Sequence, residues 1–146
     1  MQLTEMTGID QMRAVQSGAA TRPGIAMLLG MTIELVEPGH VEFSLTTRPD
    51  MSNPMGSVHG GIPATLLDSV MGCAVHTTLA VGEAYTTTDL HVHYTRGIRL
   101  DEGLIVATGD VVHRGRRIAT AEGRLHNADG KMLAHATTTC LMMSAG

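Results

Sequence analysis

A single carboxylate stands in a long uncharged stretch of the chain. Between Asp50 and Glu83, Asp68 is the only residue with a formal charge. The small and apolar residues around it are typical of a helix that is buried on nearly all sides. Burying a carboxylate without a partner is strongly unfavourable. We therefore expect Asp68 to act as a base or nucleophile at a pocket or subunit interface, with a loop-capping carboxylate as the structural alternative.

The residues before this helix supply a second chemical element. His59, Gly60 and Gly61 stand where the helix is expected to begin. Glycines at a helix start let a ligand approach backbone N–H groups that have no partner inside the helix. Those donors and the helix dipole favour a developing negative charge, as in an oxyanion hole. Asp68 lies eight residues beyond Gly60, and the combination of this carboxylate with the glycines at the helix start predicts a catalytic site.

Alternating and helical patterns place these residues in one α+β domain. We expect a short helix over 3–16, strands over 31–37 and 40–46, a long helix over 62–79, and strands over 84–96, 104–113, 117–127 and 131–143. A turn-rich loop over 47–61 precedes the long helix. One long helix and six strands joined mostly by hairpins predict an antiparallel sheet curled around a central helix. Residues 1–24 are expected to be an N-terminal helix and linker, and residues 25–146 the main domain.

Composition restricts the class of protein further. The 146 residues carry a formal net charge of −4 and scattered basic residues, which argues against a nucleic-acid partner. No apolar run approaches the roughly 18 residues that span a bilayer, and the first residues lack a signal-peptide core, so we expect a cytoplasmic protein without a membrane partner. Cys73 and Cys140 make no disulfide framework and are expected to be buried free thiols.

Several segments of the chain resemble a known family. The run NPMGSVHGG from Asn53 to Gly61, followed by Leu67-Asp68, resembles the signature of the hotdog thioesterases. The similarity continues through TTDLHVHY at 87–94, GDVVHRGRR at 109–117 and AHAT at 134–137. The chain looks most like the PaaI-type branch, named for the phenylacetate pathway, of the 4-hydroxybenzoyl-CoA thioesterase superfamily.

This resemblance implies both a fold and an activity. The fold is the hotdog, in which the sheet wraps around the long helix and pairs with a second copy. The implied activity is hydrolysis of an aryl-, arylacetyl- or medium-chain acyl-CoA to the free acid and CoA, with no cofactor. The implied assembly is a homodimer with the active site at its interface, and two such dimers form a homotetramer.

The resemblance also assigns roles by position. The catalytic residues that it implies are Asp68, Gly60, Gly61, Asn53, His59 and Thr87. Asp68 matches the carboxylate that activates water or attacks the thioester carbonyl, and Gly60 matches the backbone N–H that polarises this carbonyl. Thr87 matches a hydroxyl that a strand of the partner subunit contributes to place the water.

A second set of residues is implied to hold the coenzyme. It consists of Tyr94, Thr95, Arg96, Gly97, His113, Arg114, Gly115, Arg116 and Arg117. Arginine suits this role because its guanidinium group grips phosphate bidentately. A solvated hairpin tip is the alternative for the three arginines of the second segment. Arg96-Gly97 stands where relatives often have Arg-Pro, a departure that loosens this loop.

Other functions stay open from the sequence alone. His91 and His93 share one face of a strand, but two histidines without a further ligand at a known spacing indicate a metal only weakly, and no metal is expected. No G-x-S-x-G motif indicates a serine triad. A hotdog dehydratase or hydratase would use His59 with a carboxylate, and a non-catalytic acyl-CoA-binding module would not need Asp68.

Overall fold

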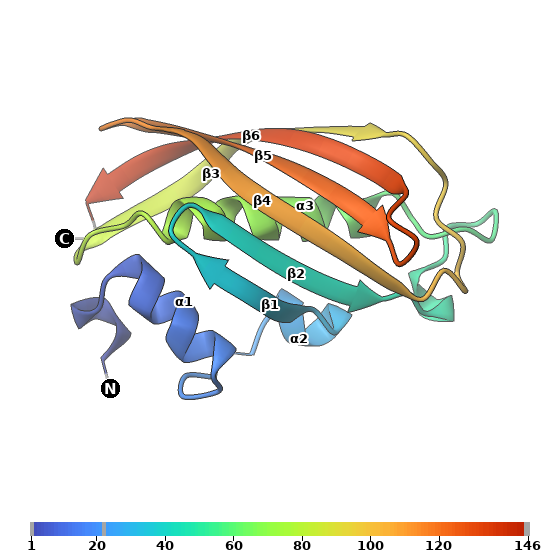
Figure 1. Cartoon of the computed structure of the whole chain (residues 1–146), viewed down its shortest axis with the longest axis horizontal. Coiled ribbons are helices and arrows are strands. Elements are labelled where there is room, and N and C mark those ends of the chain that lie inside the picture. The colour runs from blue at the N-terminus through green and yellow to red at the C-terminus, as the bar shows by residue number, and fades with distance from the viewer. Residues whose placement is uncertain (1, 22, 145–146) are drawn as a thin grey trace.

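The computed structural model describes residues 2–21 and 23–144, and Figure 1 shows its architecture. A six-stranded antiparallel sheet wraps around one long helix, α3 (Gly61–His76). The strands are β1 (Thr32–Glu37), β2 (His40–Thr46), β3 (Glu83–Tyr94), β4 (Leu104–Arg114), β5 (Ile118–Asn127) and β6 (Met132–Ser144). Their order across the sheet is β1-β2-β4-β5-β6-β3, so β1 and β3 are its edges. The α+β class and the sheet around a central helix, both predicted from the sequence, are confirmed.

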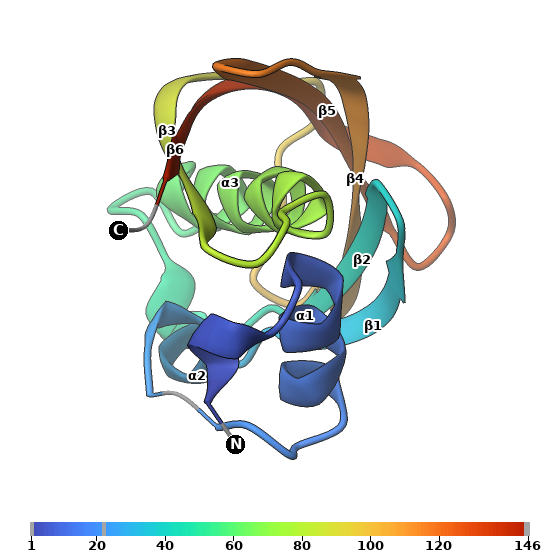
Figure 2. The same cartoon turned by 90° about the vertical axis from the view of Figure 1, so that its left-hand side faces the viewer.

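The core lies between α3 and the concave face of the sheet. Figure 2 looks along α3 and shows the sheet arching over it. Leu66, Leu67, Val70 and Met71 are completely buried on the helix side. Burying each such side chain contributes about 1.5–3 kcal/mol. The sheet approaches closely at Gly109 of β4, where an added Cβ would lie only 2.4 Å from the Val70 carbonyl oxygen.

Helix α3 ends three residues earlier than the predicted end at residue 79. The hydroxyls of Thr77 and Thr78 donate hydrogen bonds back to the carbonyls of Ala74 and Val75, both at 2.6 Å. The backbone N–H of Gly39, in the β1–β2 turn, donates to the Thr77 hydroxyl at 2.8 Å. This contact from a distant segment ends the helix before Gly82, the predicted stop signal.

The N-terminal segment differs from the single helix predicted over 3–16. It forms a 3₁₀ turn, η1 (Leu3–Glu5), and the helix α1 (Gly8–Gln16). Thr7 caps α1 by accepting the N–H of Asp10 at 3.4 Å. A Cβ on Gly8 would lie 1.8 Å from the His76 carbonyl oxygen, so α1 can pack against the end of α3 only with glycine at this position.

Two short elements of the structure were not predicted from the sequence. The helix α2 (Ile25–Leu29) and the 3₁₀ turn η2 (Pro49–Met51) are too short for a periodic pattern. Figure 2 shows α1 and α2 on the side of the molecule that the sheet leaves open.

The two cysteines were expected to be buried free thiols. Cys140 is buried, whereas Cys73 is half-buried, and both are free. Within residues 2–21 and 23–144, no helix is long and apolar enough to cross a membrane.

Candidate active site

Asp68 lies about two turns into α3, on the face that is turned toward β3. Its Oδ1 accepts a hydrogen bond from the Thr87 hydroxyl at 3.1 Å. Asp68 is half-buried in the single chain. Because β3 is an edge strand, no further strand covers this side of the helix. The carboxylate is therefore partly exposed beside the open edge of the sheet.

The origin of Thr87 also differs from the expectation. The resemblance implied that a partner subunit supplies this hydroxyl, but Asp68 and Thr87 meet within the same chain. The loop after α3 turns the chain back, and β3 then runs along the helix that it follows. The carboxylate and its hydroxyl partner thus belong to one folding unit.

The neighbours of Asp68 offer no competing nucleophile. Burial raises the pKa of the Cys73 thiol to about 12, and the negative charge of Asp68 adds to this shift. Burial also raises the pKa of Tyr85, with smaller contributions from Cys73, Cys140 and Asp68. The Cys73 thiol and the Tyr85 phenol are therefore neutral near pH 7, and the carboxylate is the group suited to act as base.

Two backbone amides at the start of α3, those of the N-cap Gly60 and of the first residue Gly61, have different roles. The N–H of Gly61 donates to Nδ1 of His59 at 2.8 Å, so this donor is already occupied. The N–H of Gly60 has no acceptor among the described residues. The Gly60 carbonyl accepts the Tyr94 hydroxyl at 2.5 Å, which holds the helix start against the end of β3. Of the two predicted donors, Gly60 is the one available to a ligand.

Asn53 organises the loop that leads to this helix start. Its Oδ1 accepts the backbone N–H groups of Met55 at 3.0 Å and Ser57 at 3.1 Å, and its Nδ2 donates to the Ser57 hydroxyl at 2.9 Å. His59 follows, with its backbone N–H bonded to the Met51 carbonyl at 2.8 Å. Asn53 therefore shapes the loop, and none of its described side-chain hydrogen bonds reaches Asp68.

Gly60 and Asp68 do not meet within one chain. Eight residues of helix separate them by about 12 Å along its axis, at 1.5 Å per residue. A base and an oxyanion donor that serve one carbonyl group must each lie about 3 Å from the reacting atoms. A single chain thus presents two halves of a site rather than one complete site.

The predicted coenzyme residues also fall into two groups. The first group, residues 94–97, lines a groove of about 230 Å³ beside the helix start. The other residues that line this groove are Ser57, Val58, Gly60, Pro63 and Ile98. This segment is brought next to Gly60, as a site for the thioester end of a coenzyme would require. Tyr94 is 53% exposed and forms one wall of the groove.

The second group, residues 113–117 of the β4–β5 hairpin, lies at the opposite end of α3. Arg114 donates to the Thr78 hydroxyl at 3.0 Å and pairs with Glu83 at 2.6 Å, just beyond the last turn of the helix. Arg116 and Arg117 are exposed. The 16-residue helix separates this hairpin from Gly60 by about 24 Å. One chain therefore does not bring the two coenzyme segments together, and Arg114 acts as a structural clamp.

Comparison with known proteins decides the family. The model of the thioesterase superfamily matches residues 55–134, which is more than half of the chain. The chain belongs to this superfamily. Its predicted class, a thioester hydrolase, is thereby confirmed.

Individual relatives of this thioesterase cover nearly the whole domain. Human acyl-coenzyme A thioesterase 13 is 27% identical over 139 residues, which span 94% of this chain and 96% of the human protein. The medium/long-chain acyl-CoA thioesterase YigI of Escherichia coli is 28% identical over 129 residues, with 78% and 82% covered. The crystal structure of a phenylacetic acid degradation-related protein from Ralstonia eutropha has a TM-score of 0.80 and 31% identity, with 88% and 97% covered. This last similarity agrees with the PaaI-type resemblance.

The sequence analysis of this thioesterase missed one residue beside α3, whose ring packs against Gly72 on the turn after Asp68. Tyr85 lies two residues before Thr87 on β3, and the period of a strand places both side chains on the same face. That spacing was the available signal. His93, in contrast, stacks on His135 with ring centroids 4.9 Å apart, and no group of three side chains among the described residues is arranged to hold a metal ion.

Proposed function

We propose that this thioesterase hydrolyses acyl-CoA at a site shared by two copies of the chain. Asp68 of one copy activates water, and the Gly60 N–H of the other copy polarises the thioester carbonyl. The observation that carries the proposal is the Asp68–Thr87 pair on the open face of α3. The unpaired Gly60 amide supports it. CoA as the carrier is supported by the names of the human and E. coli relatives.

The edge strand β3 suggests how two copies associate. It is 12 residues long, and its outer edge is open to pairing with a second β3. A two-fold pairing of these edges runs the two α3 helices in opposite directions. The Gly60 end of one copy then approaches Asp68 of the other, which would close the gap of about 12 Å left in one chain. We further propose that two such dimers form a homotetramer, and that the protein acts in the cytoplasm.

The same pairing accounts for the two separated coenzyme segments. Opposed helices place the 113–117 hairpin of one copy near the 94–97 groove of the other. The exposed side chains of Arg116 and Arg117 then face the phosphates of a CoA whose pantetheine enters beside Gly60. Arg96, which lines that groove, adds a third cation.

The chemistry follows from these positions. The thioester carbonyl oxygen accepts the Gly60 N–H, which stabilises the negative charge that develops on it. Asp68 takes a proton from a water molecule as the water oxygen bonds to the carbonyl carbon. The carbon–sulfur bond then breaks, the CoA sulfur leaves and takes up the proton, and the free acid is released. Because Thr87 engages Oδ1, Oδ2 is the oxygen that faces the water.

The decisive experiment compares two carboxylate-to-amide variants on a panel of acyl-CoA esters. Asp68→Asn should lower kcat by about 10²–10⁴-fold, the contribution of a positioned base, while CoA still binds. Asp10→Asn is the matched control, because Asp10 is exposed on α1 and its substitution should leave thiol release unchanged. Normal kcat in Asp68→Asn would refute this mechanism. CoA binding without thiol release from the wild type would favour the non-catalytic binding module instead.

A further inference from the structure

A second depression lies beside the groove at Gly60. It has a volume of about 250 Å³ and is lined by Arg96, Gly97, Arg99, Asp101, Glu102, Asn127, Ala128, Asp129 and Lys131. Sites that enclose a whole small molecule commonly reach about 300–1,000 Å³, so this depression suits one end of a longer ligand. Its two walls are the segment after β3 and the β5–β6 hairpin, which lie at the end of the molecule where α3 begins (Figure 1).

The depression borders the Gly60 groove along one short segment of the chain. Arg96 and Gly97 line both spaces. The N–H groups of Thr95 and Arg96 donate to the Leu133 carbonyl at 3.0 and 3.2 Å, which holds this segment against the β5–β6 hairpin. Apart from its chain neighbours, no atom lies within 4 Å of a Cβ added to Gly97, so only bare backbone separates the two spaces there. A long ligand that enters beside Gly60 can cross this point into the second depression.

The far wall of the depression is a turn that its own side chains hold in place. Oδ1 of Asn127 accepts the backbone N–H groups of Asp129 at 3.1 Å and Lys131 at 2.9 Å. Nδ2 of the same residue donates to Oε1 of Glu102 at 3.0 Å, which ties the turn to the opposite wall. The backbone on both sides of the depression is therefore fixed before any ligand binds.

The charged groups that line the depression are unequally engaged. Nε and Nη2 of Arg99 donate to the two oxygens of Asp101 at 2.9 and 2.8 Å, so these two charges neutralise each other. Arg96, Lys131 and Asp129 are exposed, and none of them makes an ion pair within the described part of the chain. The depression therefore offers two cations and one carboxylate to a ligand.

This combination of charges matches a phosphorylated ribose. Lysine and arginine bind phosphate oxygens, and carboxylates accept ribose hydroxyl groups in dinucleotide sites. CoA carries such a group at the end opposite its thiol, where an adenosine has a 3′-phosphate beside a free 2′-hydroxyl. The arginines that we place near the Gly60 groove serve the phosphates next to the pantetheine, so the terminal 3′-phosphate needs a further cation.

We propose that this depression binds the 3′-phosphorylated adenosine of CoA, with Lys131 and Arg96 on the 3′-phosphate and Asp129 on the ribose hydroxyl. This inference rests on the proposed acyl-CoA hydrolysis. Lys131 and Asp129 lie outside the segments that carry the family resemblance, so the site is a property of this chain. It selects esters of CoA over esters of the same pantetheine thiol without the nucleotide, such as those on an acyl carrier protein.

The experiment combines a change in the protein with a change in the substrate. Wild type should have a KM for butyryl-CoA about fivefold below that for butyryl-dephospho-CoA at equal kcat, since one exposed ion pair contributes up to about this factor. Lys131→Met keeps the apolar stem without the charge. It should raise the KM for butyryl-CoA about fivefold and leave the KM for the dephospho ester unchanged. Lys131→Arg should keep the preference, and Arg13→Met, which removes an exposed cation on α1, should change neither KM.

Equal KM values for the two esters in the wild type would overturn the proposal, as would an equal rise for both esters in Lys131→Met. If the wild type hydrolyses neither ester, the proposed function fails instead. Calorimetric titration with CoA and with dephospho-CoA then tests the nucleotide site alone. Tighter binding of CoA that depends on Lys131 would support the site, and equal affinity for the two ligands would overturn it.

Discussion

The Asp68 carboxylate accepts a hydrogen bond from a residue that is 19 positions away along the chain. The Thr87 hydroxyl orients the carboxylate, so that Oδ2 is left for the substrate water. The bond also couples the catalytic group to β3, the strand that we propose to form the dimer edge. A change in β3 should therefore reach the chemistry as well as the assembly.

Thr87→Val should lower kcat by about tenfold or more. The substitution keeps the β-branched shape but removes one hydrogen bond to a carboxylate, which contributes about 1.5–3 kcal/mol. Steady-state kinetics on the best acyl-CoA would show the fall in kcat with little change in KM. Thr87→Ser retains the hydroxyl and should restore most of the rate. Equal activity of the valine and serine variants would show that the hydroxyl has no part in catalysis.

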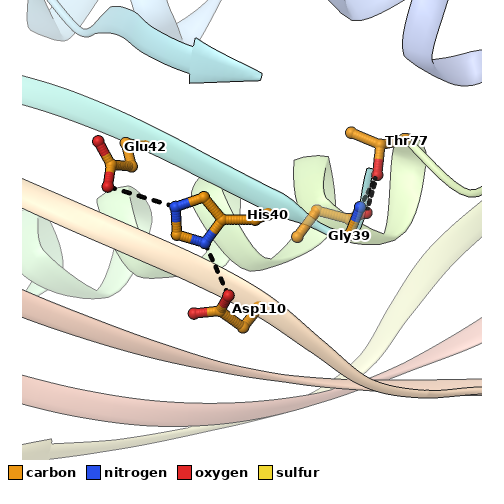
Figure 3. A network of polar contacts seen from close by, with 6 residues as sticks. Gly39, His40, Glu42, Thr77 and Asp110 are labelled. Carbon is orange, nitrogen blue, oxygen red and sulfur yellow. Dashed lines mark hydrogen bonds and ion pairs between the residues drawn. The ribbon is translucent and has the colours of Figure 1, made fainter. Parts of the chain in front are cut away.

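His40 is a second residue with a defined electrostatic environment. Figure 3 shows its ring between two carboxylates, with Nδ1 at 2.7 Å from Asp110 and Nε2 at 3.3 Å from Glu42. The hydrogen bond to Asp110 raises the pKa of His40 most strongly; partial burial opposes this shift, and Glu42 adds to it. The neighbouring Gly39 N–H bonds to Thr77, so this turn also ties the sheet to the end of α3.

The raised pKa of His40 predicts a pH dependence of stability. Its ordinary value is 6.5, so the protonated imidazole contributes its full stabilisation below that pH. The contribution is lost as pH rises through the higher pKa of the folded state. Urea unfolding should therefore show that His40→Gln lowers the free energy of unfolding more at pH 6 than at pH 8.5. The same loss at both pH values would contradict a charged interaction with Asp110 and Glu42.

At the residue scale, the sequence predicts the site unevenly. Asp68 stands out because it is the lone charge in an apolar helix, and Gly60 because of its place at the helix start. The occupied N–H of Gly61 depends on the side-chain orientation of His59, which no spacing determines. Whether Thr87 comes from the same chain is likewise a matter of tertiary geometry.

The close packing of β4 on α3 depends on a missing side chain. Gly109→Ala should lower the free energy of unfolding by about 1–3 kcal/mol, because the new Cβ would meet the backbone of Val70, which cannot move aside without shifting the helix. Chemical denaturation would measure this loss. Gly97→Ala is the control: no atom lies within 4 Å of its added Cβ, so its stability should change by less than about 0.5 kcal/mol. Equal stability of the two variants would show that β4 can move away from α3 to accommodate the added methyl group without a loss of stability.

Elements with a strong internal pattern were predicted closely, and those fixed by distant contacts were not. The strand β2 (His40–Thr46) coincides with its prediction because apolar and polar residues alternate along its sequence. The end of α3 follows from the bond between Gly39 and Thr77, 38 residues apart. The break between η1 and α1 follows from the approach of Gly8 to His76. Neither contact leaves a periodic signal in the local sequence.

At the scale of the molecule, the fold separates groups that the family signature lists together. Gly60 and Asp68 belong to one sequence motif, yet the helix places them about 12 Å apart. The 94–97 and 113–117 segments lie at opposite ends of the same helix. An antiparallel pairing of two chains would correct both separations at once, which is why we assign the complete site to the dimer.

Subunit complementation tests this assignment directly. Asp68→Asn lacks the base, and Gly60→Pro lacks the N–H donor, whereas Gly60→Ala keeps that donor and serves as its control. In a mixed dimer, the Gly60 of the first variant faces the Asp68 of the second, so one of the two sites is complete. Co-expression of the two inactive variants should therefore restore about a quarter of wild-type activity, because half of the dimers are mixed and each has one working site. If each chain carried a complete site of its own, the mixture would stay as inactive as its components.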